Sequence, residues 1–209
     1  SLSVPEKEAY GFGILQVDEN DVATAFVEKP ESSVHLCDRN GLALASMGIY
    51  VFKWNYLREL LENDAQNQNS GHDFGQDIIP SIVASGKVKA HRFENSCVQV
   101  GNFSSYWRDV GTLDAYWKAN LDLTDFTPEL NLYNKDWPIW TLNSNTPPAK
   151  FIHDEDHRRG SATNSVIGNG CIVSGTMIRN SLLSSDVQTN SYTSIVDSVI
   201  NPDVVIQRH

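Results

Sequence analysis

A repeat near the end of this chain constrains its fold more than any other feature. Three segments align at spacings of 16 and 17 residues: NSVIGNGCIV (164–173), NSLLSSDVQT (180–189) and DSVINPDVVI (197–206). Each begins with a polar residue and a serine, followed by two aliphatic residues and a small or turn-forming pair. A short strand and turn repeated at this spacing predict a parallel β-helix, in which each coil covers the apolar face of the previous one. A sandwich of short strands is the alternative.

The residues before the repeat alternate strand-like and helix-like segments, and they predict an α/β domain over 1–126. Residues 10–17 and 22–28 indicate a hairpin, because both are rich in β-forming residues and the turn sequence DEND separates them. The apolar run at 42–52 has the composition of a strand buried on both faces. The other expected elements are a helical stripe on Trp54, Leu57, Leu60 and Leu61, a second stripe from Phe74 to Val83 in which Pro80 begins or kinks a turn, a strand at 87–93, and a helix capped by Thr112.

The composition changes after this domain. Residues 127–160 contain four prolines and end in the charged run HDEDHRRG, which predicts a linker. His153 and His157 have the spacing of a metal-binding pair on a helix, but their charged neighbours favour a solvated loop. The β-helix is then expected over 161–209, truncated after barely three coils.

The charge and the cysteines narrow the class of protein. The formal net charge is −10 and the sequence pI is near 4.9, so we expect no nucleic acid and no anionic membrane as partner. No apolar run approaches the roughly 18 residues that indicate a membrane span. Three cysteines without a CxxC pair fit neither a disulfide framework nor a zinc site, which favours the cytoplasm.

Three motifs contain residue types that can bind a phosphorylated ligand. Lys29, at the end of an apolar strand before a proline, can meet a phosphate as a compact charge, and Glu28 can accept hydrogen bonds from sugar hydroxyls. The pentapeptide FVEKP alone favours a surface ion pair instead. Ser46, two residues before a glycine, allows close approach of a ligand, although small residues on strands more often serve packing. Asp109, in YWRDVGT, can be a ligand of Mg²⁺, a partner of Arg108 or a cap of the following helix. Its own residues leave these three open.

In order along the chain, FVEKP, ASMGIYVF, HDFGQDIIP, YWRDVGTLDAYWKANLDL and PPAKF precede hexapeptide-like coils. In this respect the chain resembles bacterial glucose-1-phosphate adenylyltransferase, the ADP-glucose pyrophosphorylase family, from about residue 10 onward. The resemblance implies a Rossmann-like nucleotidyltransferase domain followed by a left-handed parallel β-helix. It also implies formation of ADP-glucose and pyrophosphate from ATP and glucose 1-phosphate for glycogen biosynthesis, with Mg²⁺ as cofactor, in a homotetramer regulated by metabolites.

The resemblance also implies roles for particular residues. Glu28 and Lys29 fall on the sugar-phosphate site, with Lys29 on the phosphate, and Gly13 and Ser46 line the glucose pocket. Asp109 falls on one of two Mg²⁺-binding aspartates. The other aspartate and the Gly-rich loop of the family, which ends in Arg-Leu, do not occur in this sequence, so we expect a fragment that is inactive alone. The alternatives are another sugar-phosphate nucleotidyltransferase and a non-catalytic regulatory or scaffolding paralogue.

Overall fold

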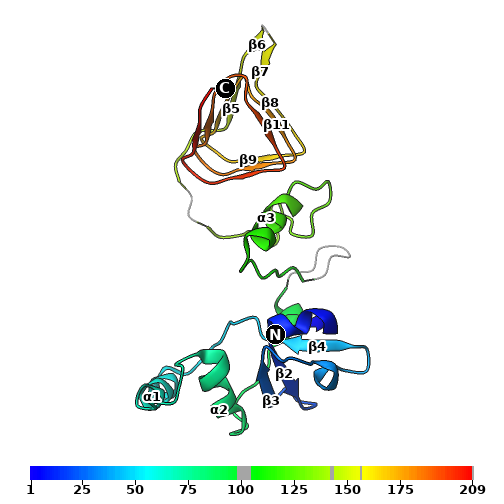
Figure 1. The fold of residues 1–209 in the computed structure, drawn as a ribbon, viewed down its shortest axis with the longest axis vertical. Helices are drawn as coiled ribbons and strands as arrows, with labels where there is room; N and C mark the ends of the chain where they lie inside the picture. Colours follow the sequence, from blue (N-terminus) through cyan, green and yellow to red (C-terminus); the bar gives the residue numbers. More distant parts are fainter. Residues whose placement is uncertain (98–104, 142–143, 156, 209) are drawn as a thin grey trace. The chain divides into compact units, whose positions relative to one another are not determined.

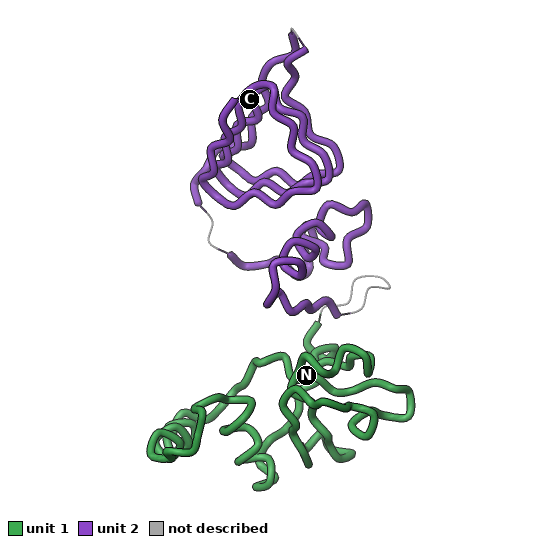
Figure 2. Tube along the Cα trace, viewed as in Figure 1, with its two compact units in different colours: residues 1–97 green, residues 98–209 purple. Residues whose placement is uncertain are grey.

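The computed structural model describes the chain except for residues 98–104, 142–143, 156 and 209. It divides the chain into two compact units, residues 1–97 and 98–209, which Figure 2 colours separately. Within the described ranges, no helix is both long and apolar enough to span a membrane.

The first unit contains a four-stranded antiparallel sheet in the order β1-β4-β2-β3 (Figure 1). The predicted hairpin is confirmed, because β2 and β3 pair from Gly13–Glu28 to the irregularity at Val17. The strand predicted over 42–52 is wrong beyond Ala45: Gly48 has a φ of +70°, and Val51 is 97% exposed. The sheet is made of β1 (Leu2–Pro5), β2 (Gly13–Val17), β3 (Ala23–Glu28) and β4 (Leu42–Ala45).

The helices of the first unit follow the predicted stripes. Pro80 stands in the first turn of α2, which follows η3 without a break, so the α-helical turn begins at this proline. The buried side chains of α2 pack with Leu15 and Leu44 of the sheet. The strand predicted at 87–93 is wrong, because it forms only an isolated bridge between Lys89 and Val22. The helices are η1 (Glu6–Gly11), η2 (Val34–Leu36), α1 (Trp54–Ala65), the π-helix η3 (Phe74–Ile78), α2 (Ile79–Val83) and η4 (Phe93–Ser96).

The second unit begins, in its described part, with an extended segment and α3 (Leu113–Asp122). The predicted cap is confirmed, since the Thr112 hydroxyl accepts the N–H of Ala115 at 3.1 Å. Trp117 donates its indole N–H to the carbonyl of Asp197 at 2.9 Å, so α3 is tied to the coils.

The repeat forms the predicted parallel coils, which Figure 1 shows end-on as a triangle. Three parallel ladders make its three sides. Lys150 pairs with Ile172, so strand pairing begins inside the segment that the sequence assigned to the linker. The inserted hairpin β6–β7 carries His153 and His157 at positive φ, which rules out the helical arrangement of a metal pair. The strands are β5 (Lys150–Ile152), β10 (Ile172–Ser174), β13 (Gln188–Thr189) and β16 (Val205–Ile206); β8 (Ser161–Thr163), β11 (Met177–Arg179) and β14 (Ser194–Val196); β9 (Val166–Ile167), β12 (Leu182–Leu183) and β15 (Val199–Ile200); and the hairpin strands β6 (Asp154–Glu155) and β7 (Arg158–Arg159).

A serine ladder explains the first residues of each repeat. Each serine hydroxyl donates to the carbonyl two residues earlier at 2.7 to 2.8 Å. The hydroxyls of the first two repeats also accept an N–H from the following coil. Ser165 accepts the N–H of Ser181 at 3.2 Å, and Ser181 accepts that of Ser198 at 3.1 Å. The residue before each serine has a left-handed backbone with φ of 47°, 47° and 49°, at Asn164, Asn180 and Asp197. Asparagine and aspartate tolerate this conformation better than most residues.

Candidate functional site

Gly13 contacts two of the other predicted site residues, Glu28 and Ser46. It lies opposite Glu28 in the β2–β3 ladder, and its carbonyl accepts the N–H of Ser46 at 2.7 Å. Lys29 follows Glu28, and its N–H donates to the carbonyl of Phe12 at 3.0 Å. The order β4-β2-β3 of the sheet therefore brings Gly13, Glu28, Lys29 and Ser46 to one end of three neighbouring strands.

The Glu28 side chain is only 22% exposed, and two glycines make room for it. A Cβ added to Gly13 would lie 2.6 Å from Oε2 of Glu28 and would overlap the Phe26 ring. A Cβ added to Gly75, from η3, would also lie 2.6 Å from Oε2. A carbon cannot approach an oxygen this closely, so a side chain at either glycine would displace the carboxylate. Sequence reasoning found Gly13 and did not single out Gly75.

Lys29 has an unusual backbone for a residue with a side chain. Its φ is +43°, a left-handed conformation that costs roughly 1–2 kcal/mol for a non-glycine residue. Strain of this kind is concentrated at functional sites. The side chain is 65% exposed, and its Nζ lies 3.9 Å from Oε1 of Glu28. The Glu28–Lys29 ion pair that the pentapeptide FVEKP favours is therefore present. The Glu28 carboxylate is largely buried, whereas the Lys29 ammonium is open to solvent.

Ser46 leaves the sheet directly after β4 and meets an aromatic pair. Its Oγ lies 3.0 Å from the Tyr50 hydroxyl, and the N–H of Gly48 donates to Oγ at 3.3 Å. The Tyr50 ring stacks on Phe74, with centroids 6.1 Å apart and planes at 16°. Tyr50 was missed by sequence reasoning. The sequence predicted one continuous strand over 42–52, whereas the chain leaves the sheet after Ala45 and there brings the Tyr50 hydroxyl to Ser46.

A cavity of about 840 Å³ opens beside this group in the first unit. Of the predicted site residues Ser46 lines it, beside Tyr50, whereas Gly13, Glu28 and Lys29 do not, and its other walls are mainly apolar. A concave apolar site with a few polar groups is typical of small-molecule binding. The apolar lining includes Leu15, Phe26, Phe52, Ile79, Ile82 and Val88.

Asp109 belongs to the second unit and is exposed. Its Oδ1 accepts the N–H of Gly111 at 3.1 Å, while Arg108 pairs with Glu129 at 3.2 Å and Thr112 caps α3. Glu129 is thus the partner of Arg108, and Thr112 is the cap of α3, so two of the three roles considered for Asp109 are taken by other residues. The third fits, because an exposed carboxylate is a hard oxygen ligand of the kind that Mg²⁺ prefers. Within the described ranges no three His, Cys, Asp or Glu side chains gather as a metal site, so Asp109 would be a single ligand.

The α/β unit and the hexapeptide coils that follow it in the sequence each match a known protein family. Residues 1–125 match the family described as Nucleotidyl transferase, and the chain belongs to this family. Residues 147–209 match the family described as GlmU-like, C-terminal hexapeptide. The predicted fold class, an α/β nucleotidyltransferase domain followed by a parallel-strand hexapeptide region, is confirmed.

More specifically, the chain is a homologue of glucose-1-phosphate adenylyltransferase, as the sequence motifs predicted. It is 54% identical over 208 residues to the enzyme of Jannaschia sp. (strain CCS1), an alignment that covers 100% of this chain and 50% of that protein. It is 54% identical over 209 residues to the enzyme of Nitrosomonas europaea, covering 100% of this chain and 48% of the relative. The chain thus spans about half the length of the curated relatives it matches.

Proposed function

We propose that this protein supplies the glucose 1-phosphate site of a glucose-1-phosphate adenylyltransferase, which forms ADP-glucose and pyrophosphate for glycogen biosynthesis. The observation that supports this most is the meeting of Gly13, Glu28, Lys29 and Ser46 at one end of the sheet. In this proposal residues 1–126 act as the C-terminal half of the catalytic domain, and a linker joins them to the β-helix, whose strand pairing begins at Lys150.

The proposed binding roles follow from charge and exposure. The carboxylate of Glu28, held between two glycines, accepts hydrogen bonds from glucose hydroxyls. Ser46, with the Tyr50 hydroxyl beside it, lines the sugar pocket together with Gly13. The exposed ammonium of Lys29 contacts the phosphate as a point charge.

The proposed reaction is an in-line displacement. A phosphate oxygen of glucose 1-phosphate forms a bond to the α-phosphorus of ATP, and the bond from that phosphorus to the bridging oxygen of the β-phosphate breaks. The bridging oxygen keeps the electron pair and leaves as pyrophosphate. Catalysis is then positioning and charge neutralisation, in which Lys29 fixes the attacking phosphate and reduces its charge.

Asp109 is the residue of this chain that would hold Mg²⁺, and it acts in the proposal as a catalytic residue alongside Lys29. When bound, the ion would neutralise charge on the ATP phosphates. The contribution of the chain is to present the carboxylate on the turn before α3, where the N–H of Gly111 orients Oδ1. The homotetramer and the cytoplasmic location belong to the proposal as well; for the location, all three cysteines are free thiols.

A hybrid enzyme tests the proposal. In it, this chain replaces the aligned half of the Nitrosomonas europaea relative. We expect ADP-glucose synthesis from ATP and glucose 1-phosphate by the hybrid and none by the 209-residue chain alone. An inactive hybrid beside an active parent enzyme would favour the non-catalytic paralogue, and preference for another sugar 1-phosphate would favour a different sugar nucleotidyltransferase.

Replacing Lys29 by alanine in the hybrid tests the phosphate contact. We expect the KM for glucose 1-phosphate to rise by roughly 10- to 100-fold, since a hydrogen bond to a charged group is worth about 1.5–3 kcal/mol. The KM for ATP and kcat should change much less. Lys7→Ala, at another exposed lysine of the same unit, is the control. An unchanged KM for glucose 1-phosphate in Lys29→Ala would remove the assignment.

A further inference from the structure

We infer that Gly75 is a positioning residue for Glu28: the turn at Gly75 forms a wall without a side chain, against which the Glu28 carboxylate rests. This wall would set where the carboxylate meets the sugar. The inference rests on the proposed function, because it assumes that Glu28 binds glucose 1-phosphate. It goes beyond that function by assigning a role to a residue that touches no substrate.

Space, and not backbone conformation, explains the glycine at this position. Gly75 lies in the π-helix η3 without the left-handed φ that would exclude other residues. An added Cβ would instead lie 2.6 Å from Oε2 and 2.9 Å from Cδ of Glu28. Contacts under about 3.0 Å are not seen for real Cβ atoms. An alanine at this position therefore needs either the wall or the carboxylate to move.

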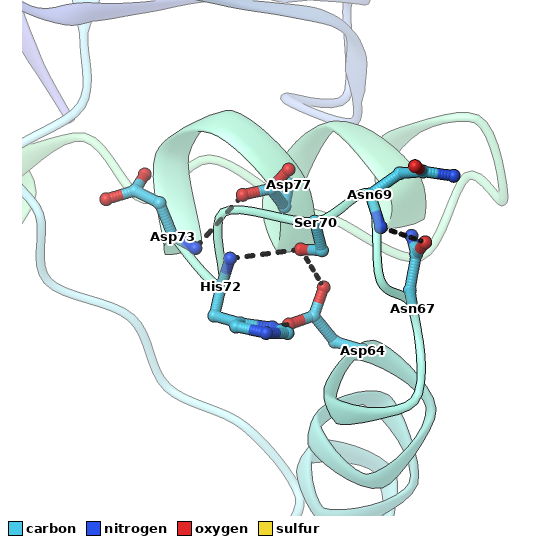
Figure 3. A network of polar contacts seen from close by, with 7 residues as sticks. All are labelled: Asp64, Asn67, Asn69, Ser70, His72, Asp73 and Asp77. Carbon is cyan, nitrogen blue, oxygen red and sulfur yellow. Dashed lines mark hydrogen bonds and ion pairs between the residues drawn. The ribbon is translucent and has the colours of Figure 1, made fainter.

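Two aspartates hold the wall in place. Oδ1 of Asp73 accepts the N–H groups of Gly75 and Gln76 at 2.7 and 2.8 Å. In return, Oδ2 of Asp77 accepts the N–H of Asp73 at 3.0 Å, a contact drawn in Figure 3. This is a reciprocal cap, of the kind that determines where a helix begins. The N–H of Gly75 is thus held by Asp73, and a shift of this backbone away from Glu28 would disturb that hydrogen bond.

A second set of contacts anchors the preceding turn to the end of α1 (Figure 3). Asp64 accepts a hydrogen bond from the Ser70 hydroxyl at 2.6 Å and contacts Nδ1 of His72 at 2.7 Å. The N–H of His72 donates to the Ser70 Oγ at 3.0 Å. The Ser70 hydroxyl and the His72 ring hold the pKa of Asp64 below its ordinary value. Because these contacts hold the backbone of the wall, we expect the free end of the Glu28 side chain to be the part that moves.

Gly13, on the other side of the carboxylate, is a less selective probe. A Cβ there would overlap the Phe26 ring as well as Glu28. The ring packs against the apolar core of the first unit, so Gly13→Ala would disturb folding and the carboxylate together. At Gly75 the contacts under 3.0 Å are to Glu28 alone, and the next nearest atom is Oδ1 of Asp73 at 3.3 Å.

A double-mutant cycle in the hybrid enzyme tests the inference. Gly75→Ala is expected to raise the KM for glucose 1-phosphate by about tenfold, the loss of one good hydrogen bond, and to leave the KM for ATP within about twofold. In the Glu28→Ala background, Gly75→Ala should add less than about twofold, because the group it displaces is gone. In the Glu28→Asp background the side chain is one methylene shorter and its carboxylate no longer reaches the wall, so the effect of Gly75→Ala should likewise be smaller.

The outcomes separate this inference from the proposed function. Gly11→Ala, with nothing within 4 Å of its added Cβ, is the matched control and should leave the KM unchanged. If Glu28→Ala leaves the KM for glucose 1-phosphate unchanged, the sugar site itself is wrong. If Glu28→Ala raises it while Gly75→Ala does not, or if the two effects multiply independently, the positioning role is overturned.

A variant that adds no atom covers the case in which Gly75→Ala does not fold. His72→Ala removes the contact to Asp64 and loosens the wall. We expect about a threefold rise in the KM for glucose 1-phosphate when Glu28 is present and no further rise in Glu28→Ala. An equal rise in both backgrounds would overturn the inference.

Discussion

The coils and the α/β unit use the left-handed backbone in different ways. In the coils it recurs at equivalent positions, so that Asn164, Asn180 and Asp197 share nearly the same φ. In the first unit, left-handed residues other than glycine stand singly, and two of them, Lys29 and His72, lie in or next to the candidate site. A repeat uses one local solution many times, whereas a binding site needs backbone arrangements that occur once.

The two regions also distribute their contacts differently. Each coil pairs with the coils directly before and after it, so its stability is close to a sum of neighbour terms. The candidate site combines the β2–β3 hairpin, the end of β4 and η3, which are separated along the sequence. We therefore expect changes in the coils to alter stability with little effect on the KM for glucose 1-phosphate, and changes in the site to do the reverse.

The largest expected effect is in the core of the coils. Leu183 is 1% exposed, and Leu183→Ala should lower the free energy of unfolding by about 2–5 kcal/mol through lost burial and a cavity. Urea unfolding followed by circular dichroism measures it. Met177→Ala, at a side chain that is 55% exposed, should stay within about 0.5 kcal/mol. If Leu183→Ala raised the KM for glucose 1-phosphate as much as Lys29→Ala does, the expected separation between coil stability and sugar binding would be wrong.

Asp109→Asn tests whether the second unit acts on turnover while the first acts on sugar binding. Loss of the negative charge should lower kcat of the hybrid by about 100-fold at saturating substrates, because metal-ion catalysis is worth several kcal/mol. The measurement is kcat against Mg²⁺ concentration. Asp114→Asn, an exposed carboxylate in the first turn of α3, is the control. Near-normal turnover of Asp109→Asn at all Mg²⁺ concentrations would refute the metal role.

Ser181→Ala tests the ladder that links the coils. The substitution removes a buried hydroxyl and leaves the N–H of Ser198 without its acceptor, which should cost about 1–3 kcal/mol of unfolding free energy. Ser194→Ala, at an exposed serine of β14, should change the unfolding midpoint in urea very little. Equal midpoints for the two variants would show that the ladder contributes nothing to coil stability.

The smallest expected effect is the pH dependence of the turn at Ser70 and His72. The pKa of Asp64 is lowered from 3.8, first by the Ser70 hydroxyl and then by His72. Its contribution is therefore fully present above the ordinary pKa and is lost as the pH falls through the lowered one. Below about pH 4 the amide of His72 should lose protection from hydrogen exchange, after correction for the intrinsic rate. The same profile in Asp64→Asn would contradict this origin.

The sequence by itself determined the elements whose signals are local. The spacing of the repeat specifies parallel pairing because each strand meets only its neighbours, and the coils formed as predicted. The DEND hairpin and the Thr112 cap follow from turn and cap chemistry within a few residues. The motifs in order also identified the family, which the relatives confirm. The roles of Lys29 and Asp109 stay predictions.

Only the tertiary structure decided where strands end and what surrounds Glu28. The apolar run at 42–52 looks continuous, but the chain turns at Gly48 after Ala45, and its later residues are not held in the sheet. The meeting of Gly75 with Glu28 joins residues far apart in sequence, and no local pattern records it. Propensity and spacing describe the chain within a few residues, whereas the space left for a carboxylate depends on which segments fold against it.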